Sequence, residues 1–233
     1  MKKLAAVLLL LAAAIGAVLF WLSGNIDGLI KDAIANYGSA MTQARVGVDA
    51  VKIAPADGKG SISNLSIGNP AGFKTAHALK VGQIDIELDL ASVAKDVVVI
   101  RRIAIKAPDV IYEKGEAMTN FDAIQKNIAS YVGAADDKKA GRKLIVEELT
   151  IRDAKAQASA AFMNGKTVSV PLPDIILKNL GKAKGGITPG ELGQEVAGAL
   201  KGKLSNAVSF DRLMKSTGDA LDKAGAVVKG LFK

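Results

Sequence analysis

The chain has 233 residues, a single histidine, no cysteine and a formal net charge of +8. Without cysteine there are no disulfides, no thiolate catalysis and no thiolate metal sites, and one histidine leaves little for a catalytic triad or a histidine-rich metal centre. Aromatic residues make up only 4% of the chain, so the positive charge lacks the stacking side chains typical of nucleic-acid binding, and we expect no nucleic-acid partner.

An uncharged apolar segment extends from Leu4 to Leu22, directly after Lys2 and Lys3. As an α-helix it would be about 28 Å long, which matches the hydrocarbon core of a bilayer. A signal peptide cleaved near Ala14 is the alternative, but the apolar run continues past this residue, which favours an uncleaved anchor. The two lysines favour a cytoplasmic N-terminus and therefore a body outside the cytoplasm. The anchor prediction depends on Leu4, Leu8, Leu11, Ile15, Val18, Trp21 and Leu22.

Residue patterns divide the chain into four parts. They are a cytoplasmic stub and membrane anchor at 1–22, a juxtamembrane helix at 23–43, a β-rich body at 44–180 and an amphipathic helical region at 187–233. In the second part, apolar residues from Ile26 to Tyr37 recur at helical spacing, and Gly38 is expected to end the helix.

Alternating side chains predict strands in the body. In the segment Val81–Leu90, Ile84, Ile86, Leu88 and Leu90 face one way, whereas Asp85, Glu87 and Asp89 face the other. One face is therefore expected to be buried and the other wet. Further strands are predicted at Val97–Ile105, Val110–Tyr112, Leu144–Ile151, Ala154–Phe162, Thr167–Leu172 and Ile175–Leu177, with Asn164-Gly165 as a tight hairpin turn before the segment at Thr167.

One strand pattern occurs twice. The segments that begin at Ile103 and Leu149 each place an alternating apolar strand before a basic residue and a short turn. This similarity suggests a repeated strand-turn-strand unit, although antiparallel sheets also produce such echoes by chance.

Two helical patterns complete the fold prediction. The first covers Phe121–Val132, with Thr119 or Asn120 as its cap, and the second begins at Pro189, just after Thr188. The second helix would either cover the sheet or lie on an anionic membrane surface through its lysines, among them Lys201. Together the elements predict an α+β fold in which a transmembrane helix precedes an antiparallel, twisted sheet with a groove, a helical insertion and C-terminal amphipathic helices.

Candidate chemistry is sparse, and we assign no catalytic residue, metal or cofactor. His77 is expected to be a loop residue beside a strand. The carboxylates of Asp85, Glu87 and Asp89 have the oxygen ligands that a hard cation takes, but a solvated sheet face explains them more simply. Arg101 and Arg102 are adjacent, so they are expected to face opposite sides of a strand, which argues against a joint anion clamp.

A short turn carries a family resemblance. The segment Gly60–Phe73, which ends in Asn69, Pro70, Ala71, Gly72 and Phe73, resembles the AsmA family of bacterial envelope proteins. Similarity continues at 78–82, 99–110 and 172–181, and the order of anchor and strand-rich body also agrees. Asn-Pro favours an extended-to-turn dipeptide and Gly72 relieves backbone restriction, so Phe73 is expected to fold back as an apolar plug.

The resemblance implies a single-pass inner-membrane protein whose body lies in the periplasm of a Gram-negative envelope. Larger relatives are thought to form long sheets with an apolar groove for acyl chains. Since the strand-rich body here has only about 130 residues, a bridging role is in doubt. The expected function is to assist lipid transport, lipid homeostasis and outer-membrane biogenesis without enzymatic activity, with membrane phospholipid as the partner. The lipid-facing candidates are Ile84, Ile86, Leu88, Leu90, Ile103 and Ile105. A structural adaptor that recruits an envelope protein partner without binding lipid is the alternative.

Overall fold

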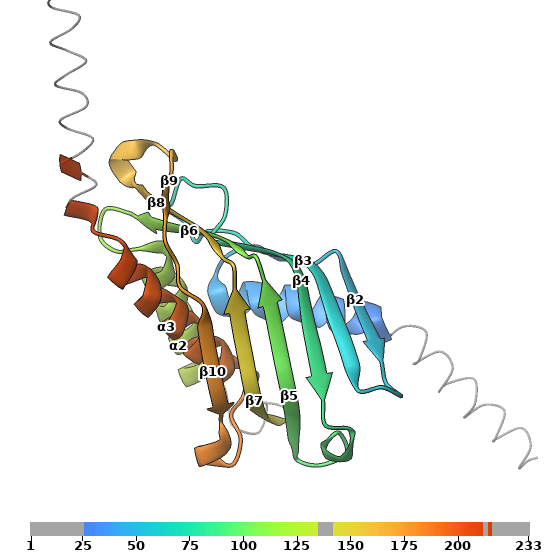
Figure 1. Cartoon of the computed structure of the whole chain (residues 1–233). Helices are drawn as coiled ribbons and strands as arrows, with labels where there is room; N and C mark the ends of the chain where they lie inside the picture. The colour runs from blue at the N-terminus through green and yellow to red at the C-terminus, as the bar shows by residue number, and fades with distance from the viewer. Residues whose placement is uncertain (1–25, 135–141, 212–213, 216–233) are drawn as a thin grey trace, which may run out of the picture.

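The computed structural model describes residues 26–134, 142–211 and 214–215. These residues form an α+β fold in which helices lie behind one face of a large twisted sheet (Figure 1). The predicted fold class is confirmed for this part of the chain. The predicted anchor at Leu4–Leu22 and the end of the C-terminal region lie outside the described residues.

The sheet has ten strands in the described part, in the order β10-β7-β5-β4-β6-β8-β9, with β3 also paired to β4 and with β1 and β2 paired to β3. Their bounds are β1 Val46–Gly47, β2 Ala50–Ala54, β3 Lys59–Ile67, β4 Leu79–Leu88, β5 Val97–Lys106, β6 Asp109–Lys114, β7 Lys143–Arg152, β8 Lys155–Ala160, β9 Val168–Val170 and β10 Ile175–Leu180. Short 3₁₀ turns follow at η1 Leu90–Ser92, η3 Ala161–Met163 and η4 Lys182–Lys184.

The sheet is mixed, which corrects the prediction of a wholly antiparallel one. β5 runs parallel to β7, and β6 runs parallel to β8. The reason is the repeated unit noted in the sequence, because β5 with β6 and β7 with β8 are two copies of it that lie side by side. Ile103 pairs with Leu149, and Asp109 pairs with Lys155, so the copies are in register.

A line of irregularities crosses three neighbouring strands. Between β4 and β5 the register shifts after Glu87, because Arg101 of β5 is left out of the pairing. At the same level, Glu147 of β7 and Asn179 of β10 are also left out of the strand pairing. Such bulges place two consecutive side chains on one face. Arg101 and Arg102 are both exposed, so the prediction that they face opposite sides was wrong.

Among the described residues, three helices pack near the sheet: one at 26–42, α2 at Asn120–Ala134 and α3 at Pro189–Ala207. The first continues through Gly38, which was expected to end it. Gly38 instead allows a close approach of the chain, because a Cβ there would lie 3.0 Å from Cγ1 of Val46.

Both later helices begin at capping boxes. Thr188 caps α3 as expected, because its hydroxyl accepts a hydrogen bond from the backbone N–H of Glu191 while the Glu191 carboxylate accepts one from the Thr188 N–H. Thr119 and Asp122 form the same reciprocal pair at the start of α2. The capping residues therefore fix where each helix begins.

The turn between β8 and β9 is longer than predicted. Asn164 and Gly165 have φ angles of 50° and 81°, as a tight turn requires. They lie, however, in a connection that also contains η3, because the two strands pair only up to Ala158 and Val168. The two-residue hairpin was therefore wrong in length but right in backbone conformation.

Candidate functional site

The predicted lipid-facing residues form one apolar strip on the helix side of β4 and β5. Ile84 pairs with Ile105 and Ile86 pairs with Ile103, while Leu88 lies opposite Ile100. We call Ile84, Ile86, Leu88, Ile103 and Ile105 the apolar strip. The structure brings these five residues together, whereas Leu90 lies beyond the end of β4 in η1 and is 48% exposed.

The apolar strip is only partly buried. Ile84 is 6% exposed, but the other four residues keep intermediate exposure while they pack against the main hydrophobic core. Two rows of apolar side chains continue from the strip across the sheet. In one row Ile105 pairs with Ile151 of β7, which pairs with Ile175 of β10, and in the other Ile103 pairs with Leu149, which pairs with Leu177. The far end of each row is more deeply buried: Ile151 and Leu149 are 4% and 3% exposed.

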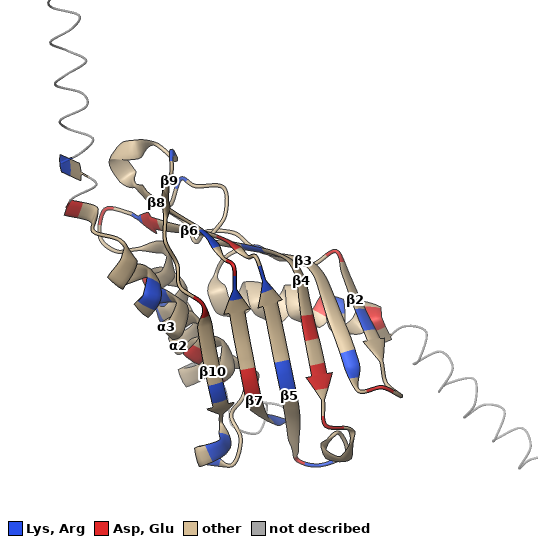
Figure 2. Cartoon of the chain, viewed as in Figure 1, with Lys and Arg blue, Asp and Glu red and all other residues tan. Residues whose placement is uncertain are grey.

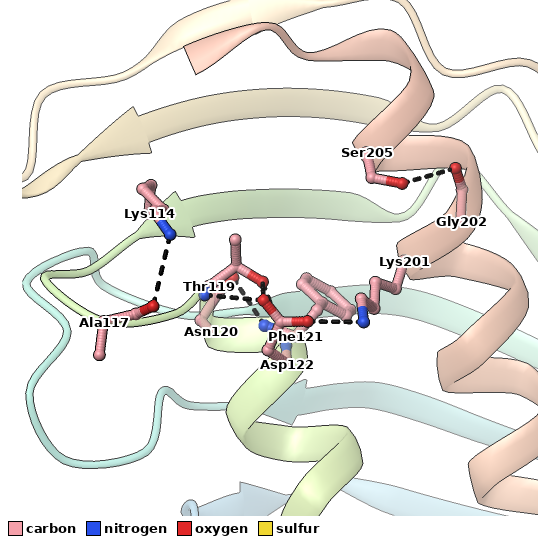
Figure 3. Close-up of polar contacts among 9 residues, drawn as sticks. All are labelled: Lys114, Ala117, Thr119, Asn120, Phe121, Asp122, Lys201, Gly202 and Ser205. Carbon is pink, nitrogen blue, oxygen red and sulfur yellow. Dashed lines mark hydrogen bonds and ion pairs between the residues drawn. The ribbon is translucent and has the colours of Figure 1, made fainter. Parts of the chain in front are cut away.

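The helix α3 covers that far end of the sheet. It packs against β7, β10 and α2, and its residues Leu200 and Leu204 are buried in the core. Lys201 reaches from α3 to the start of α2, where its Nζ lies 2.6 Å from Oδ1 of Asp122 (Figure 3). This lysine therefore makes an internal ion pair in the body of the protein.

The ion pair shifts both of its members. Burial raises the pKa of Asp122, but hydrogen bonds from Lys201 and Thr119 outweigh this effect and leave the pKa below its ordinary value of 3.8. The hydrogen bond to Asp122 raises the pKa of Lys201 above 10.5. Both groups stay charged at neutral pH, so the contact between α2 and α3 is a charge-assisted one.

The opposite face of the sheet carries a row of alternating charges (Figure 2). Each member of this row lies directly opposite the next on the neighbouring strand, across five strands: Lys59 of β3, Glu87 of β4, Arg102 of β5, Glu148 of β7 and Lys178 of β10. We call these residues the charge row. Since neighbouring members have opposite sign, each strand pair gains a favourable cross-strand contact.

The carboxylates of Asp85 and Glu87 in β4 and of Asp89 just after it are engaged separately. Asp85 accepts a hydrogen bond from Gln83, and Asp89 forms an ion pair with Arg101 at 2.8 Å. In the described ranges, no group of three histidine or acidic side chains is arranged to hold a metal ion.

The turn that carries the family resemblance is fastened by a buried polar network. Asn69 donates to the carbonyl and hydroxyl of Thr75, and Asn120 at the start of α2 donates to Oδ1 of Asn69. Pro70 is buried, Gly72 has a φ of 97°, and Phe73 lies against Gly115, where a Cβ would be 3.0 Å from its ring.

Glu113 is the centre of this network, and no sequence pattern identified it. It is only 1% exposed, and its carboxylate accepts hydrogen bonds from the backbone N–H groups of Lys74 and Thr75 and from the Thr75 hydroxyl. Its own backbone N–H donates to Asn120. A glutamate between a tyrosine and a lysine at a strand end gives no sign of burial, and its donors are 38 and 39 positions away along the chain.

His77 lies just before β4 and is 7% exposed. Its Nε2 is 3.3 Å from Oδ2 of Asp109, whose other oxygen accepts a hydrogen bond from Gln157. Burial lowers the pKa of His77 below 6.5, and the carboxylate of Asp109 offsets only part of this effect. The residue is thus a buried, neutral side chain in the loop just before β4, as predicted for its position beside a strand.

A hollow of about 490 Å³ lies along β10 beneath α3. Four consecutive residues from Asp174 to Leu177 form one side, and Ala199, Gly202, Lys203 and Asn206 of α3 form the other. Because consecutive residues of the strand line it, the hollow follows the outer edge of β10 and not one of its faces.

Within the described residues, no helix combines the length and apolar character needed to cross a bilayer. Comparison of the chain with family models, with curated proteins and with solved structures found no match in any of the three.

Proposed function

We propose that this chain is a membrane-anchored, AsmA-like protein of the bacterial envelope that binds phospholipid acyl chains and so assists lipid transport and outer-membrane biogenesis. The proposal assigns no catalytic step. The observation that carries it is the apolar strip on the helix side of β4 and β5. All of its side chains except Ile84 remain partly exposed, whereas Leu149 and Ile151, which pair with Ile103 and Ile105, are buried in the core.

The energetics suit a weak and reversible contact. Each buried methylene contributes about 0.8 kcal/mol, so covering five methylenes of one acyl chain would contribute roughly 4 kcal/mol. Leu90, which is 48% exposed beyond the end of β4, extends the apolar surface toward the turn between β4 and β5. An acyl chain that follows β4 would therefore have an accessible end.

Photocrosslinking of the full chain in phospholipid vesicles tests this proposal. A photoreactive residue in place of Leu88 or Leu90 is expected to form lipid adducts, which mass spectrometry detects. The matched control is the same residue in place of Lys178, which lies on the opposite face of the sheet. Equal adduct yields at all three positions would mean that the labels report only nearness to the bilayer, and the proposal would be wrong.

The structural adaptor remains a second candidate, because α3 already covers the β7 and β10 part of the sheet with its buried residues Leu200 and Leu204. On that reading the same photoreactive positions, used in cells, would yield one dominant protein adduct and no lipid adduct.

A further inference from the structure

In the described sheet, β2, β9 and β10 are edge strands, and the β2 and β10 edges differ in how they are protected. At the β2 edge, the backbone N–H of Ile53 donates to Asp27, and Lys31 donates to the carbonyl of Asp49. Both side chains come from the helix at 26–42, so this helix occupies backbone groups that a further strand would use. At the other edge, β10 pairs with β7 alone among the described strands.

The segment 174–178, which includes the first residues of β10, is self-complementary. It reads Asp174-Ile175-Ile176-Leu177-Lys178, and in an antiparallel pair centred on Ile176 each Asp174 lies opposite a Lys178, each Ile175 opposite a Leu177, and Ile176 opposite itself. Pro173 before the segment lacks a backbone N–H, and Asn179 after it has a φ of 55°. The pairing segment is therefore bounded at five residues.

Charge and burial both favour this register. Lys178 ends the charge row, and an acidic residue from a sixth strand would continue the alternation that already crosses five strands. Ile176 is 50% exposed on the same face, and self-pairing would cover it.

The hollow along the edge of β10 has space for a second strand. A neighbouring strand lies ~4.8 Å away, which is where the hollow follows the edge of β10. There the apolar residues of a second copy would point toward Ala199 and Gly202 of α3. Ala199 has only a methyl group and Gly202 has no side chain, and a Cβ on Gly202 would meet nothing within 4 Å.

From these observations we infer that β10 is the interface of a two-fold symmetric homodimer, in which two copies of this chain join their sheets edge to edge. The pairing is isologous, so it closes after two copies. Because only five residues of each chain pair, the affinity is expected to be roughly micromolar.

Cysteine crosslinking of the full chain in detergent micelles tests the interface. Because the chain has no native cysteine, each single-cysteine variant has one thiol, at the chosen position. Ile176→Cys is expected to form a disulfide dimer on oxidation, because the two Cβ atoms would be roughly 5 Å apart. Lys178→Cys is the register control, since the two copies of this residue would lie about 13 Å apart along the strands. A mixture of Asp174→Cys and Lys178→Cys chains is expected to crosslink between the two variants. Equal yields from Ile176→Cys and Lys178→Cys would show contact through the micelle rather than through β10 and would overturn the inference.

Charge exchange gives an independent test. Asp174→Lys places four lysines at the interface and Lys178→Asp places four aspartates there, so each variant alone is expected to lose at least tenfold in dimer affinity. Mixed together, the two variants form a heterodimer in which both contacts again join opposite charges, and its affinity is expected to return toward that of the wild type. The loss of the hydrogen bond from the Asp153 N–H to Asp174 does not explain such recovery, because it is lost in the mixture as well. Failure of the mixture to associate in analytical ultracentrifugation would refute the pairing.

Discussion

Replacing Glu113 with Gln tests whether the buried network holds the Asn69–Phe73 turn. The substitution keeps the size of the side chain but turns one carboxylate oxygen into an NH₂ group. The donors at Lys74 and Thr75 lie 2.6 to 2.8 Å from the carboxylate, so any orientation of the amide places a donor against at least one of them. Hydrogen bonds to a charged group contribute about 1.5–3 kcal/mol each, and a buried donor without a partner costs about 1–3 kcal/mol. One lost and two weakened hydrogen bonds predict a loss of roughly 2–4 kcal/mol in the free energy of unfolding.

Pulse proteolysis of the full chain in micelles across a urea series measures this free energy. Glu116→Gln is the matched control, because Glu116 is exposed in the same connection between β6 and α2 and is expected to change stability by less than ~0.5 kcal/mol. Thr75→Val removes the hydroxyl that donates to Glu113 and accepts from Asn69. It is expected to cost less after Glu113→Gln than in the wild type, because Thr75 and Glu113 share a hydrogen bond. If Glu113→Gln unfolds at the same urea concentration as Glu116→Gln, the network does not stabilise the turn.

Two further predictions concern the helices and the single histidine. Lys201→Met is expected to lower the free energy of unfolding by roughly 0.5–1 kcal/mol, measured by thermal unfolding. The loss is small because the Lys201 and Asp122 side chains are 34% and 32% exposed and solvent screens their attraction. Lys126→Met, at an exposed position of α2, is the control, and equal melting temperatures for the two variants would contradict the prediction. His77 has a folded pKa below its unfolded value of 6.5, so stability is expected to fall as the pH drops from 7.5 through 6.5, where the unfolded chain takes up a proton that the folded chain does not. His77→Gln is expected to reduce this slope in melting temperature, and an unchanged slope would show that other groups cause it.

Local signals in the sequence predicted most elements. The alternation in β4 and the repeat shared by β5 and β7 identified strands, and Thr188 with Pro189 located the start of α3. These signals act over a few residues, so they are visible in the chain itself. Strand order does not follow from such local signals, because the parallel pairing of β5 with β7 joins residues 46 positions apart, for example Ile103 and Leu149. The repeat contained this information, since two copies of one unit stack side by side when their registers match.

The candidate site was predictable only in part. Alternation alone placed Ile84, Ile86 and Leu88 on one face of β4, and the structure brings Ile103 and Ile105 beside them. The degree of cover over this strip depends on where the helices pack, which no local pattern encodes. Glu113 was missed for a related reason: a buried carboxylate is recognised by its donors, and these come from a distant turn. Of the predicted turn, Asn69 is linked to Glu113 through Thr75 and Asn120.

The line of irregularities through Arg101, Glu147 and Asn179 couples the lengths of three strands. Beyond this line the inward residues are Ile100, Val146 and Leu180, and before it they are Ile103, Leu149 and Leu177, so each strand changes the phase of its alternation at the same level. Deleting one residue from β5 alone at this level would turn half of that strand inside out relative to β7. A viable change in the length of one strand therefore requires the same change in its neighbours, and variation in this part of the chain is expected to occur by insertion or deletion in matched sets.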